Sequence, residues 1–477
     1  MSAGFRTFNP SQNTWNPEEY FPTSEAALAE KLNTLSLAQS IYGKLSAESR
    51  AEFLAAIHAS LEQRKEHIKT FCLRESGLSS PRFETEWKRT LTTIQLFEQY
   101  LRNQYIFEKT EEFQSDSIRI QKVTLPIGPV LVLGSSNFPL AYSTAGGDTI
   151  AAFAAGCCVL VKAHAMHAGT SVLVAECIED ARKTLNLPEG VFTHVLDDGF
   201  QHAQRLCLDE RIQAIGFTGS FKGGKALMDL AHSRKNPIPV FAEMGSVNPV
   251  VIDENLSSKQ QETVAEKLAH SICNDAGQFC TKPGVIFIPH GQTGEHFTQR
   301  LKQFIAETTA VPMLHPNIHG NFENGKTEIA SISGVKFTSA SIPQNGIEGR
   351  WSLAEADVKT FIEHQRLQEE VFGPFSLLVT YNSKEELHTG LEALSGQLTG
   401  SIFYETHSDL VTDCIEMLSR KVGRIILNDV PTGVRVTETM HHGGPFPASS
   451  DVRFTAVGPD SIQRFQKYVS IQQKNRT

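Results

Sequence analysis

The chain has 477 residues, of which 40% are hydrophobic and 20% are charged, and its 53 acidic and 44 basic side chains leave a net charge of −9. This length exceeds one compact domain and suits two or three domains, each with its own core. The acidic balance gives no electrostatic reason to expect a nucleic acid as partner, and the eight cysteines, none in a Cys-x-x-Cys pair, predict neither a disulfide framework nor a zinc site.

Nothing in the sequence predicts a membrane partner. Residues 1–20 are polar and lack the apolar core of a secretory segment. The stretch nearest to a membrane span, residues 141–161, is interrupted by Asp148 and by glycines, so we predict a helix followed by a buried strand. With sparse cysteines, a reducing cytoplasm is the expected location.

In chain order, the first hundred residues are predicted to be helical. Residues 47–68 carry Phe53, Leu54, Ile57 and Leu61 at helical spacing. Residues 117–125 alternate between apolar and polar side chains and predict a strand.

From residue 130 onward, short apolar runs alternate with helical patterns. The strands are expected at 130–133, 159–161 and 214–217, and the helices at 144–155, 169–185 and 223–231. This alternation predicts a parallel α/β sheet, which binds ligands at the carboxyl ends of its strands.

The run Phe217–Gly224 reads as a strand, a glycine turn and the start of a helix. Backbone amides at such a helix start bind phosphate, which makes Gly219, Ser220 and Gly224 candidate cofactor-binding residues. The run Gly219-x4-Gly224-Lys225 lacks one residue of a P-loop, because Ala226 stands where a Ser or Thr would bind magnesium. A P-loop nucleotide-binding protein therefore stays only as the alternative from a different class.

Two other polar residues follow predicted strands. Asn137 comes after the strand at 130–133, where its amide could donate to a developing oxyanion, and Lys162 ends the strand at 159–161, where it could reach ribose and phosphate. Taken alone, each position favours the simpler interpretation, which is an Asn that shapes a turn and a Lys exposed to solvent.

The most informative residues are Cys280 and Glu243. Cys280 lies in a loop of small and polar residues, and Glu243 ends the apolar run Pro239–Ala242. A thiol nucleophile and a carboxylate base together suit covalent chemistry on a carbonyl. Lys282, two residues after the thiol, either lowers its pKa or points to solvent.

These motifs, with Gln368–Phe375 and Gly443–Ala448, resemble the aldehyde dehydrogenase superfamily in content, order and spacing over nearly the whole chain. The runs Phe241–Pro249 and His442–Ala448 resemble in particular the group that holds 2-oxoglutarate semialdehyde (2,5-dioxopentanoate) dehydrogenases and NADP-dependent fatty aldehyde dehydrogenases.

The resemblance implies an NAD(P)-dependent oxidation of an aldehyde to a carboxylate through a cysteine thioester. The preferred substrate prediction is 2,5-dioxopentanoate, and the alternative is a medium- or long-chain aliphatic aldehyde. CoA-acylating relatives lack the Glu, so hydrolysis is expected. No metal is expected. The implied roles are Cys280 as nucleophile, Glu243 as base for water, Asn137 as oxyanion donor, Glu370 on the nicotinamide ribose, Phe372 near the ring, and His442 as a substrate-side relay or a structural residue.

The residue three positions after Lys162 bears on the choice of cofactor. NAD-preferring relatives carry a Glu there for the adenosine ribose hydroxyls, whereas this chain has Ala165. NADP is therefore expected, with NAD as the second choice. Candidate cationic partners for a 2′-phosphate are Lys162, His164, His202 and Arg205.

The predicted fold is α/β and aldehyde dehydrogenase-like, in three discontinuous parts. A Rossmann-type cofactor domain comprises residues 1–111 and 127–243, an α/β catalytic domain residues 244–446, and a small β oligomerisation element residues 112–126 and 447–477. The amphipathic strand at 117–125 would leave an exposed edge unless it were paired, so a homodimer or homotetramer is expected.

Overall fold

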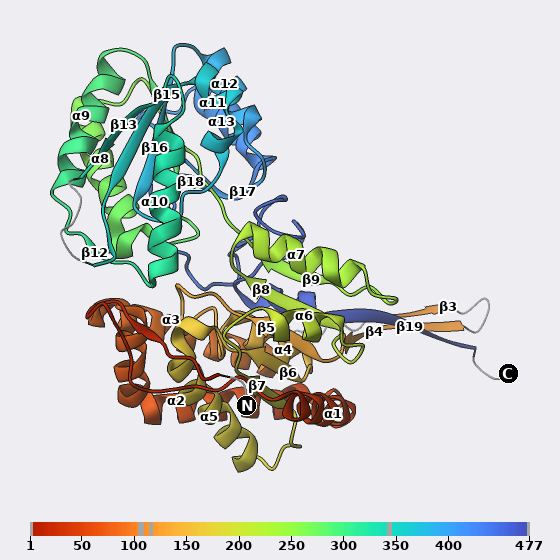
Figure 1. Cartoon of the computed structure of the whole chain (residues 1–477). Coiled ribbons are helices and arrows are strands. Elements are labelled where there is room, and N and C mark those ends of the chain that lie inside the picture. Colours follow the sequence, from red (N-terminus) through yellow and green to blue (C-terminus); the bar gives the residue numbers. More distant parts are fainter. Residues whose placement is uncertain (1–2, 104–108, 114–117, 341–345, 475–477) are drawn as a thin grey trace.

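The computed structural model describes residues 3–103, 109–113, 118–340 and 346–474. It consists of two α/β lobes and a narrow sheet that projects away from them (Figure 1). The lobes follow the two halves of the chain. The α/β class and the aldehyde dehydrogenase-like fold predicted from the sequence are confirmed.

The first lobe contains a five-stranded parallel sheet in the order β7-β6-β5-β8-β9. Its strands are short, apolar and mostly buried, as expected for a sheet covered by helices on both faces. In chain order they are β5 (Val130–Leu133), β6 (Val159–Lys162), β7 (Phe192–Val195), β8 (Ala214–Thr218) and β9 (Val240–Glu243).

Seven helices belong to the first lobe among the described residues. Serine side chains cap several of them, since a hydroxyl satisfies an otherwise unpaired N–H at the start of a helix. The helices are α1 (Glu25–Tyr42), α2 (Ala47–Ser76), α3 (Ser80–Arg102), α4 (Gly147–Ala155), α5 (Ala168–Thr184), α6 (Gln201–Leu208) and α7 (Phe221–His232), with the short turn η1 (Ala165–His167) before α5 and the two-stranded pair β1 (Phe8–Asn9) and β2 (Thr14–Trp15) before α1.

The second lobe contains a seven-stranded sheet in the order β13-β15-β16-β11-β10-β17-β18, parallel except for β13. The strands are β10 (Val250–Ile252), β11 (Val285–Pro289), β13 (Lys336–Ser339), β15 (Ser352–Asp357), β16 (Phe375–Tyr381), β17 (Gln397–Phe403) and β18 (Val422–Leu427), and β12 (Val311–Pro312) pairs with β14 (Glu348–Gly349) beside it. The helical elements are α8 (Ser258–Cys273), η2 (Asn274–Gly277), α9 (Gln292–Ala306), α10 (Pro316–Ala330), α11 (Val358–Glu363), η3 (Gln365–Gln368), α12 (Lys384–Ala393) and α13 (Asp409–Ser419).

The projecting sheet has the order β19-β4-β3 and is antiparallel. Its strands are β3 (Lys109–Phe113), β4 (Ile118–Pro126) and β19 (Gln466–Lys474). The strand β3 begins three residues before the expected boundary at residue 112. The predicted division into three domains stays a prediction.

Residues 447–465 do not join this sheet, in contrast to the expected tail. They lie against the first lobe instead: Met244 N donates to Ala448 O at 2.8 Å, Ser450 Oγ donates to Val240 O at 2.6 Å, and the turn η4 (Pro459–Phe465) pairs Arg464 with Asp148 of α4 at 2.6 Å. The pattern of the sequence could not separate this segment from β19, because both are short and irregular in polarity.

The remaining sequence predictions concern single segments. Residues 141–161 form α4 and then β6, as expected, and none of the described helices is long and apolar enough to cross a membrane. The helix expected at 223–231 begins two residues earlier, because Ser220 caps it. All eight cysteines are free, and six of them are buried.

Candidate active site

A cleft of about 2240 Å³ is lined by residues of both lobes. This exceeds the 300–1,000 Å³ typical of a pocket for one small ligand and leaves room for a dinucleotide beside a second molecule. Of the residues predicted from the sequence, ten line it together: Asn137, Lys162, His164, Ala165, Gly219, Ser220, Glu243, Cys280, Glu370 and Phe372. Gly224 and His442 do not line it.

A tight turn leads into the loop of Cys280. Asp275, Ala276 and Gly277 all have positive φ angles, of 46°, 54° and 63°, directly after α8. Such left-handed conformations are unfavourable for residues other than glycine, so contacts must hold the turn. Arg82 Nε lies 2.9 Å from Asp275 Oδ2, and a Cβ at Gly277 would come within 2.5 Å of the Gly373 carbonyl carbon.

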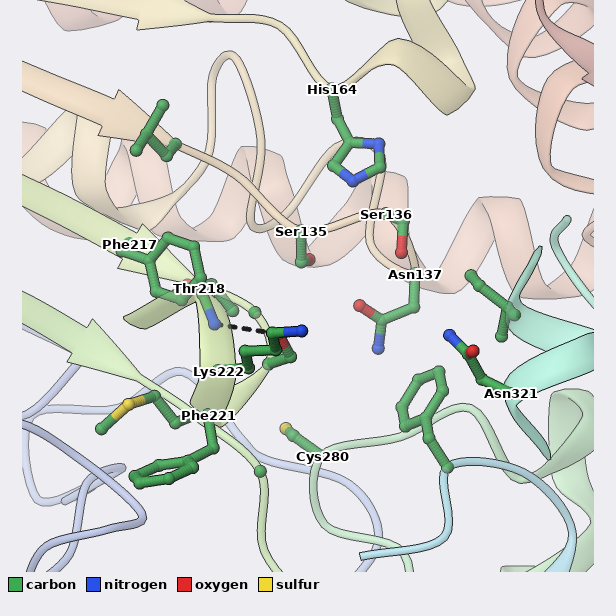
Figure 2. A pocket seen from close by; sticks show the side chains of 18 of the residues that line it. Ser135, Ser136, Asn137, His164, Phe217, Thr218, Phe221, Lys222, Cys280 and Asn321 are labelled. Atoms are coloured by element: carbon green, nitrogen blue, oxygen red, sulfur yellow. Dashed lines mark hydrogen bonds between the residues drawn. The ribbon is translucent and has the colours of Figure 1, made fainter. Parts of the chain in front are cut away.

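Asn248 fixes the far side of the same loop. Its Nδ2 donates to Cys280 O at 2.8 Å and to Lys282 O at 2.9 Å, and the Asn248 side chain is fully buried. The backbone around the thiol is therefore held on both sides. Figure 2 shows Cys280 and Asn137 facing the same cavity.

Glu243 lies at the carboxyl end of β9 and is only 4% exposed. Its Oε1 is 3.1 Å from His442 Nε2, and the same nitrogen is 3.8 Å from Cys280 Sγ. The sequence placed no third polar residue near His442, but the fold brings the thiol, the carboxylate and the imidazole together. One donor atom from each lies within 4.8 Å of the others, a spacing also compatible with a soft metal ion, and the expectation of no metal stays a prediction.

The pKa values in this cluster diverge. Burial raises the pKa of Cys280 well above its ordinary value, and the charge of Glu243 raises it further. Burial alone would raise the pKa of Glu243, but the interactions with His442 and with the thiol bring it below its ordinary value. The free site therefore holds a protonated thiol beside a carboxylate. These shifts oppose proton transfer in the free site, so transfer of the thiol proton must be coupled to the attack of sulfur on the substrate.

Asn137 follows β5 and donates through Nδ2 to Gln278 O at 2.9 Å, two residues before the thiol. The Gln278 side chain in turn accepts from Leu314 N at 3.0 Å. The amide thus sits at the nucleophile loop, next to the position where an oxyanion would form. Its role as an oxyanion donor stays a prediction.

The glycine turn after β8 fits a phosphate-binding role in part. Gly219 and Ser220 line the cleft at the start of α7, and Ser220 Oγ accepts from Gly223 N at 3.2 Å. Gly224 instead allows close packing, because a Cβ there would come within 2.5 Å of Met244 Sδ. Lys225 pairs with Asp229 on the outer face of α7 and does not line the cleft, in contrast to a P-loop lysine.

Lys162 and Ala165 line the cleft at the end of β6 and at the start of η1. Lys162 Nζ donates to Gly199 O at 3.0 Å, and burial lowers its pKa while the nearby Asp197 and Asp198 act in the opposite direction. Burial holds the pKa of His164 well below its ordinary value, so its ring is neutral.

Two of the four cations suggested for a 2′-phosphate are engaged elsewhere. His202 Nε2 contacts Thr23 O at 2.7 Å, and Arg205 pairs with Glu25. Neither residue lines the cleft. Of the four, Lys162 alone combines a charge with a place in the cleft lining.

The Glu370 carboxylate packs against Gly245, since a Cβ on this glycine would come within 2.4 Å of the carboxylate. Burial raises the pKa of Glu370 to about 7, and Lys282 opposes that shift. Lys282 does not point to solvent: it is 1% exposed and Nζ donates to Phe375 O at 2.6 Å, with its pKa lowered to about 8 by burial. Lys282 therefore faces the Glu370 side of the loop, and Glu369 is exposed as expected.

Sequence reasoning missed several residues of the site, among them Asn248, Gln278, Tyr142, Arg89 and Arg424. Asn248 lies inside the run Phe241–Pro249, where a polar side chain between apolar residues is a signal in the sequence. Arg89 and Arg424 lie on α3 and β18, distant in sequence from every motif, and only the fold relates them to the thiol.

The site defines an enzyme that acts covalently on a carbonyl with a dinucleotide. A cysteine is held beside a carboxylate at the edge of the cleft, and a lysine at a strand end and a glycine turn line the rest of it. Residues 4–321 match the family model described as the aldehyde dehydrogenase family, and the chain belongs to that family. The resemblance seen in the sequence is confirmed, as is the expectation of an NAD(P)-dependent aldehyde dehydrogenase.

Two curated relatives align over almost the full length of the chain. The alpha-ketoglutaric semialdehyde dehydrogenase of Acinetobacter baylyi is 37% identical over 97% of this chain and 91% of its own. The alpha-ketoglutaric semialdehyde dehydrogenase 2 of Azospirillum brasilense is 36% identical over 99% of this chain and 92% of its own. Among solved structures, 1-pyrroline-5-carboxylate dehydrogenase from Thermus with bound NAD has a TM-score of 0.86 at 17% identity, covering 100% of this chain and 91% of that one, which shows the shared fold.

Proposed function

We propose that this enzyme oxidises 2,5-dioxopentanoate to 2-oxoglutarate by hydrolysis of a cysteine-bound thioester. The observation that supports the chemistry is that Cys280 and Glu243 both contact His442 Nε2. Cys280 and Glu243 also line a cleft large enough for a dinucleotide. The names of the two relatives that align over nearly the full length support the substrate. A screen of aldehydes that follows the absorbance of the reduced cofactor tests the proposal, and 2,5-dioxopentanoate is expected to give the highest kcat/KM.

The residues divide the reaction into two halves. Glu243 takes the thiol proton, the Cys280 sulfur bonds to the aldehyde carbon, and Asn137 with the Cys280 N–H stabilises the oxyanion, each such donor contributing about 3–4 kcal/mol. A bound nicotinamide supplies the hydride acceptor that turns the thiohemiacetal into a thioester. Glu243 passes the proton taken from the thiol to solvent. It then takes a proton from water, which attacks the thioester carbon and releases the carboxylate and the thiol.

Two alternatives within the family differ in what they require. A CoA-acylating enzyme needs CoA for turnover and no base for water, so turnover without CoA argues against it. An enzyme for long aliphatic aldehydes needs an apolar path to the thiol with no charge at its end.

We infer that NADP serves at least as well as NAD. Ala165 lines the cleft and offers no carboxylate to repel a 2′-phosphate or to bind the two hydroxyls of NAD. Lys162 supplies the positive charge within the same lining. The residues in place thus suit a nicotinamide dinucleotide of either kind, and the side chain at position 165 itself does not repel the phosphate.

The replacement Ala165→Glu tests this inference. The new carboxylate is expected to shift the ratio of kcat/KM toward NAD by tenfold or more, because each charge-assisted hydrogen bond contributes about 1.5–3 kcal/mol and the phosphate is repelled. Steady-state kinetics with both cofactors and one aldehyde measure the ratio. A wild-type preference of tenfold or more for NAD would show that another residue decides.

We also propose that the enzyme is a homo-oligomer. The projecting sheet exposes several large apolar side chains, and β19 forms one of its edges, where a row of backbone groups lies open to another strand. The exposed side chains are Leu125, Tyr468, Val469 and Ile471.

Light scattering at micromolar concentration is expected to give the mass of a dimer or tetramer. Replacing Val469 and Ile471 by lysine is expected to reduce that mass, since the charges oppose burial of this face. A monomer mass for the wild-type enzyme would contradict the proposal.

The cytoplasm is the proposed place of action. The support is that all eight cysteines are free and one of them is proposed to work as a thiol, which a reducing compartment preserves.

A further inference from the structure

An arginine outside the cleft joins the two lobes beside the catalytic residues. Arg82 lies on α3 of the first lobe, and its side chain is only 10% exposed. Its Nε lies 2.9 Å from Asp275 Oδ2, in the turn η2 of the second lobe. The same guanidinium donates through Nη1 to Glu86 Oε2 at 2.9 Å, one helical turn further along α3. The charge therefore has a carboxylate partner in each lobe, which offsets the cost of removing it from water.

Glu86 holds the loop that carries Asn137. Its side chain is fully buried, and Oε1 accepts from Leu140 N at 2.8 Å and from Ala141 N at 3.0 Å. Both residues follow Asn137 in the loop after β5. Charge-assisted hydrogen bonds of this kind are shorter and stronger than neutral ones, so the backbone of the loop is well fixed. The loop of the proposed oxyanion donor is thus anchored to the carboxylate that Arg82 binds.

The guanidinium also lies over two phenylalanine rings. Its central carbon is 4.7 Å from the centroid of the Phe138 ring and 5.4 Å from that of the Phe279 ring, and the two rings meet edge to face at 5.7 Å. Phe138 directly follows Asn137, and Phe279 directly precedes Cys280. A planar cation binds aromatic faces most strongly where water is excluded. Arg82 therefore contacts a neighbour of Asn137 in the first lobe and a neighbour of Cys280 in the second.

The turn that leads to the nucleophile depends on the same guanidinium. Asp275 and Ala276 have left-handed backbone conformations, which cost free energy in residues other than glycine. Burial raises the pKa of Asp275, and the charge of Arg82 acts in the opposite direction and favours the carboxylate. Without Arg82, this strained turn would lose its ion pair with the first lobe. The loop of Cys280 would then be free to shift relative to Asn137.

We propose that Arg82 is a positioning residue that holds Asn137 and Cys280 at the separation at which the oxyanion of the substrate meets the Asn137 amide. The two residues come from different lobes, and Figure 2 shows both facing the same cavity. A donor stabilises an oxyanion only within hydrogen-bond distance, and a misplacement of about 1 Å can lower a rate by about 10²-fold. Arg82 does not line the cleft, so it acts through these two residues. The inference rests on the role proposed for Asn137 and not on the identity of the aldehyde.

The replacement Arg82→Met tests the role, because it removes the charge and keeps much of the length of the side chain. It is expected to lower kcat with 2,5-dioxopentanoate by about 10- to 100-fold, while KM for the cofactor stays within about threefold. Arg82→Lys keeps the charge without the planar fork and is expected to fall between wild type and Arg82→Met. Circular dichroism during heating checks that each variant is folded at the assay temperature. If Arg82→Met does not fold, Arg82→Lys takes its place in the experiments below.

A double-mutant cycle with Asn137→Ala distinguishes positioning from a merely structural role. If Arg82 acts through Asn137, Arg82→Met loses most of its effect once the amide is absent, and kcat is expected to change by less than about threefold in the Asn137→Ala background. A general loss of structure would lower kcat by the same factor in both backgrounds. Alkylation of Cys280 by iodoacetamide forms no oxyanion, so its rate in Arg82→Met is expected to stay within about threefold of wild type.

Arg74→Met is the matched control. Arg74 also pairs with a carboxylate and lies over a phenylalanine ring, with Glu18 Oε1 at 2.8 Å and the Phe71 centroid at 4.6 Å. None of these three residues lines the cleft. Loss of an arginine with this set of contacts is expected to leave kcat within about twofold of wild type.

The possible results separate this inference from the proposed function. Turnover of Arg82→Met within threefold of wild type, or the same loss in both backgrounds of the cycle, would overturn the positioning role while the proposed function stands. If Asn137→Ala alone leaves kcat unchanged, the oxyanion role of Asn137 and the positioning role are both wrong. If the screen finds a better aldehyde than 2,5-dioxopentanoate and the cycle with that aldehyde is non-additive, the substrate proposal is wrong and the positioning role stands.

Discussion

Replacement of Cys280 by alanine is expected to lower kcat by roughly 10⁵- to 10⁶-fold, as removal of a nucleophile does when no other group forms the covalent bond. The side chain that replaces it cannot bond to the aldehyde carbon, so neither hydride transfer nor thioester formation follows. Cofactor affinity is expected to stay within about twofold, because Lys162, Gly219 and Glu370 remain in place. Steady-state kinetics and a fluorescence titration with reduced cofactor measure the two effects separately.

Cys273→Ala provides the control for that experiment. Cys273 ends α8, is also free and half-buried, and does not line the cleft. The control is expected to keep wild-type activity. Turnover of Cys280→Ala within a few-fold of wild type would remove Cys280 from its proposed role.

The sequence predicted those parts of the site that lie at the ends of strands. Lys162 ends β6 and Glu243 ends β9. Gly219 directly follows β8, and Asn137 lies in the loop after β5. Because the carboxyl ends of parallel strands share one edge, a correct strand assignment already brings such residues together. The alternation of apolar runs and helices was strong enough to place these strands.

Contacts that arise only from the tertiary fold were not predicted, although His442 itself was a candidate through the family resemblance. His442 reaches Glu243 because residues 448–450 pair with β9, a contact with no local signature. Arg89 reaches the site from α3, where an arginine on a helix reads as a surface charge. The sequence left open whether Lys282 lies near the thiol or points to solvent. Burial of a lysine depends on the shape of the loop around it and not on neighbouring residues in the sequence.

The arrangement of charges also explains why one carboxylate can serve both halves of the reaction. In the free site, the interaction with His442 lowers the pKa of Glu243, and the charge of Glu243 raises the pKa of the Cys280 thiol. The thiol therefore stays protonated and unreactive until a substrate makes transfer of its proton productive. Once sulfur is acylated, the same carboxylate faces the thioester and has only water to deprotonate.

Replacement of Glu243 by glutamine is expected to separate the two halves of the reaction. Glutamine has nearly the same shape but cannot accept a proton, so water is not activated and the thioester persists. Steady-state turnover is expected to fall by about 10²- to 10⁴-fold, after a burst of at most one reduced cofactor per active site. Stopped-flow absorbance records the burst, and mass spectrometry of the quenched enzyme is expected to show the acyl group on Cys280.

The pH dependence of that burst follows from the sign of the interaction between the two groups. The negative charge of Glu243 raises the pKa of Cys280, so its removal lowers that pKa, although burial still keeps it raised. The burst rate in Glu243→Gln is therefore expected to rise with pH as the thiol ionises without a base. Added hydroxylamine, which attacks a thioester directly, is expected to restore turnover. Glu369→Gln, the loss of an exposed carboxylate, serves as the control and is expected to leave activity unchanged. Steady-state turnover of Glu243→Gln within a few-fold of wild type would exclude Glu243 as the base that activates water.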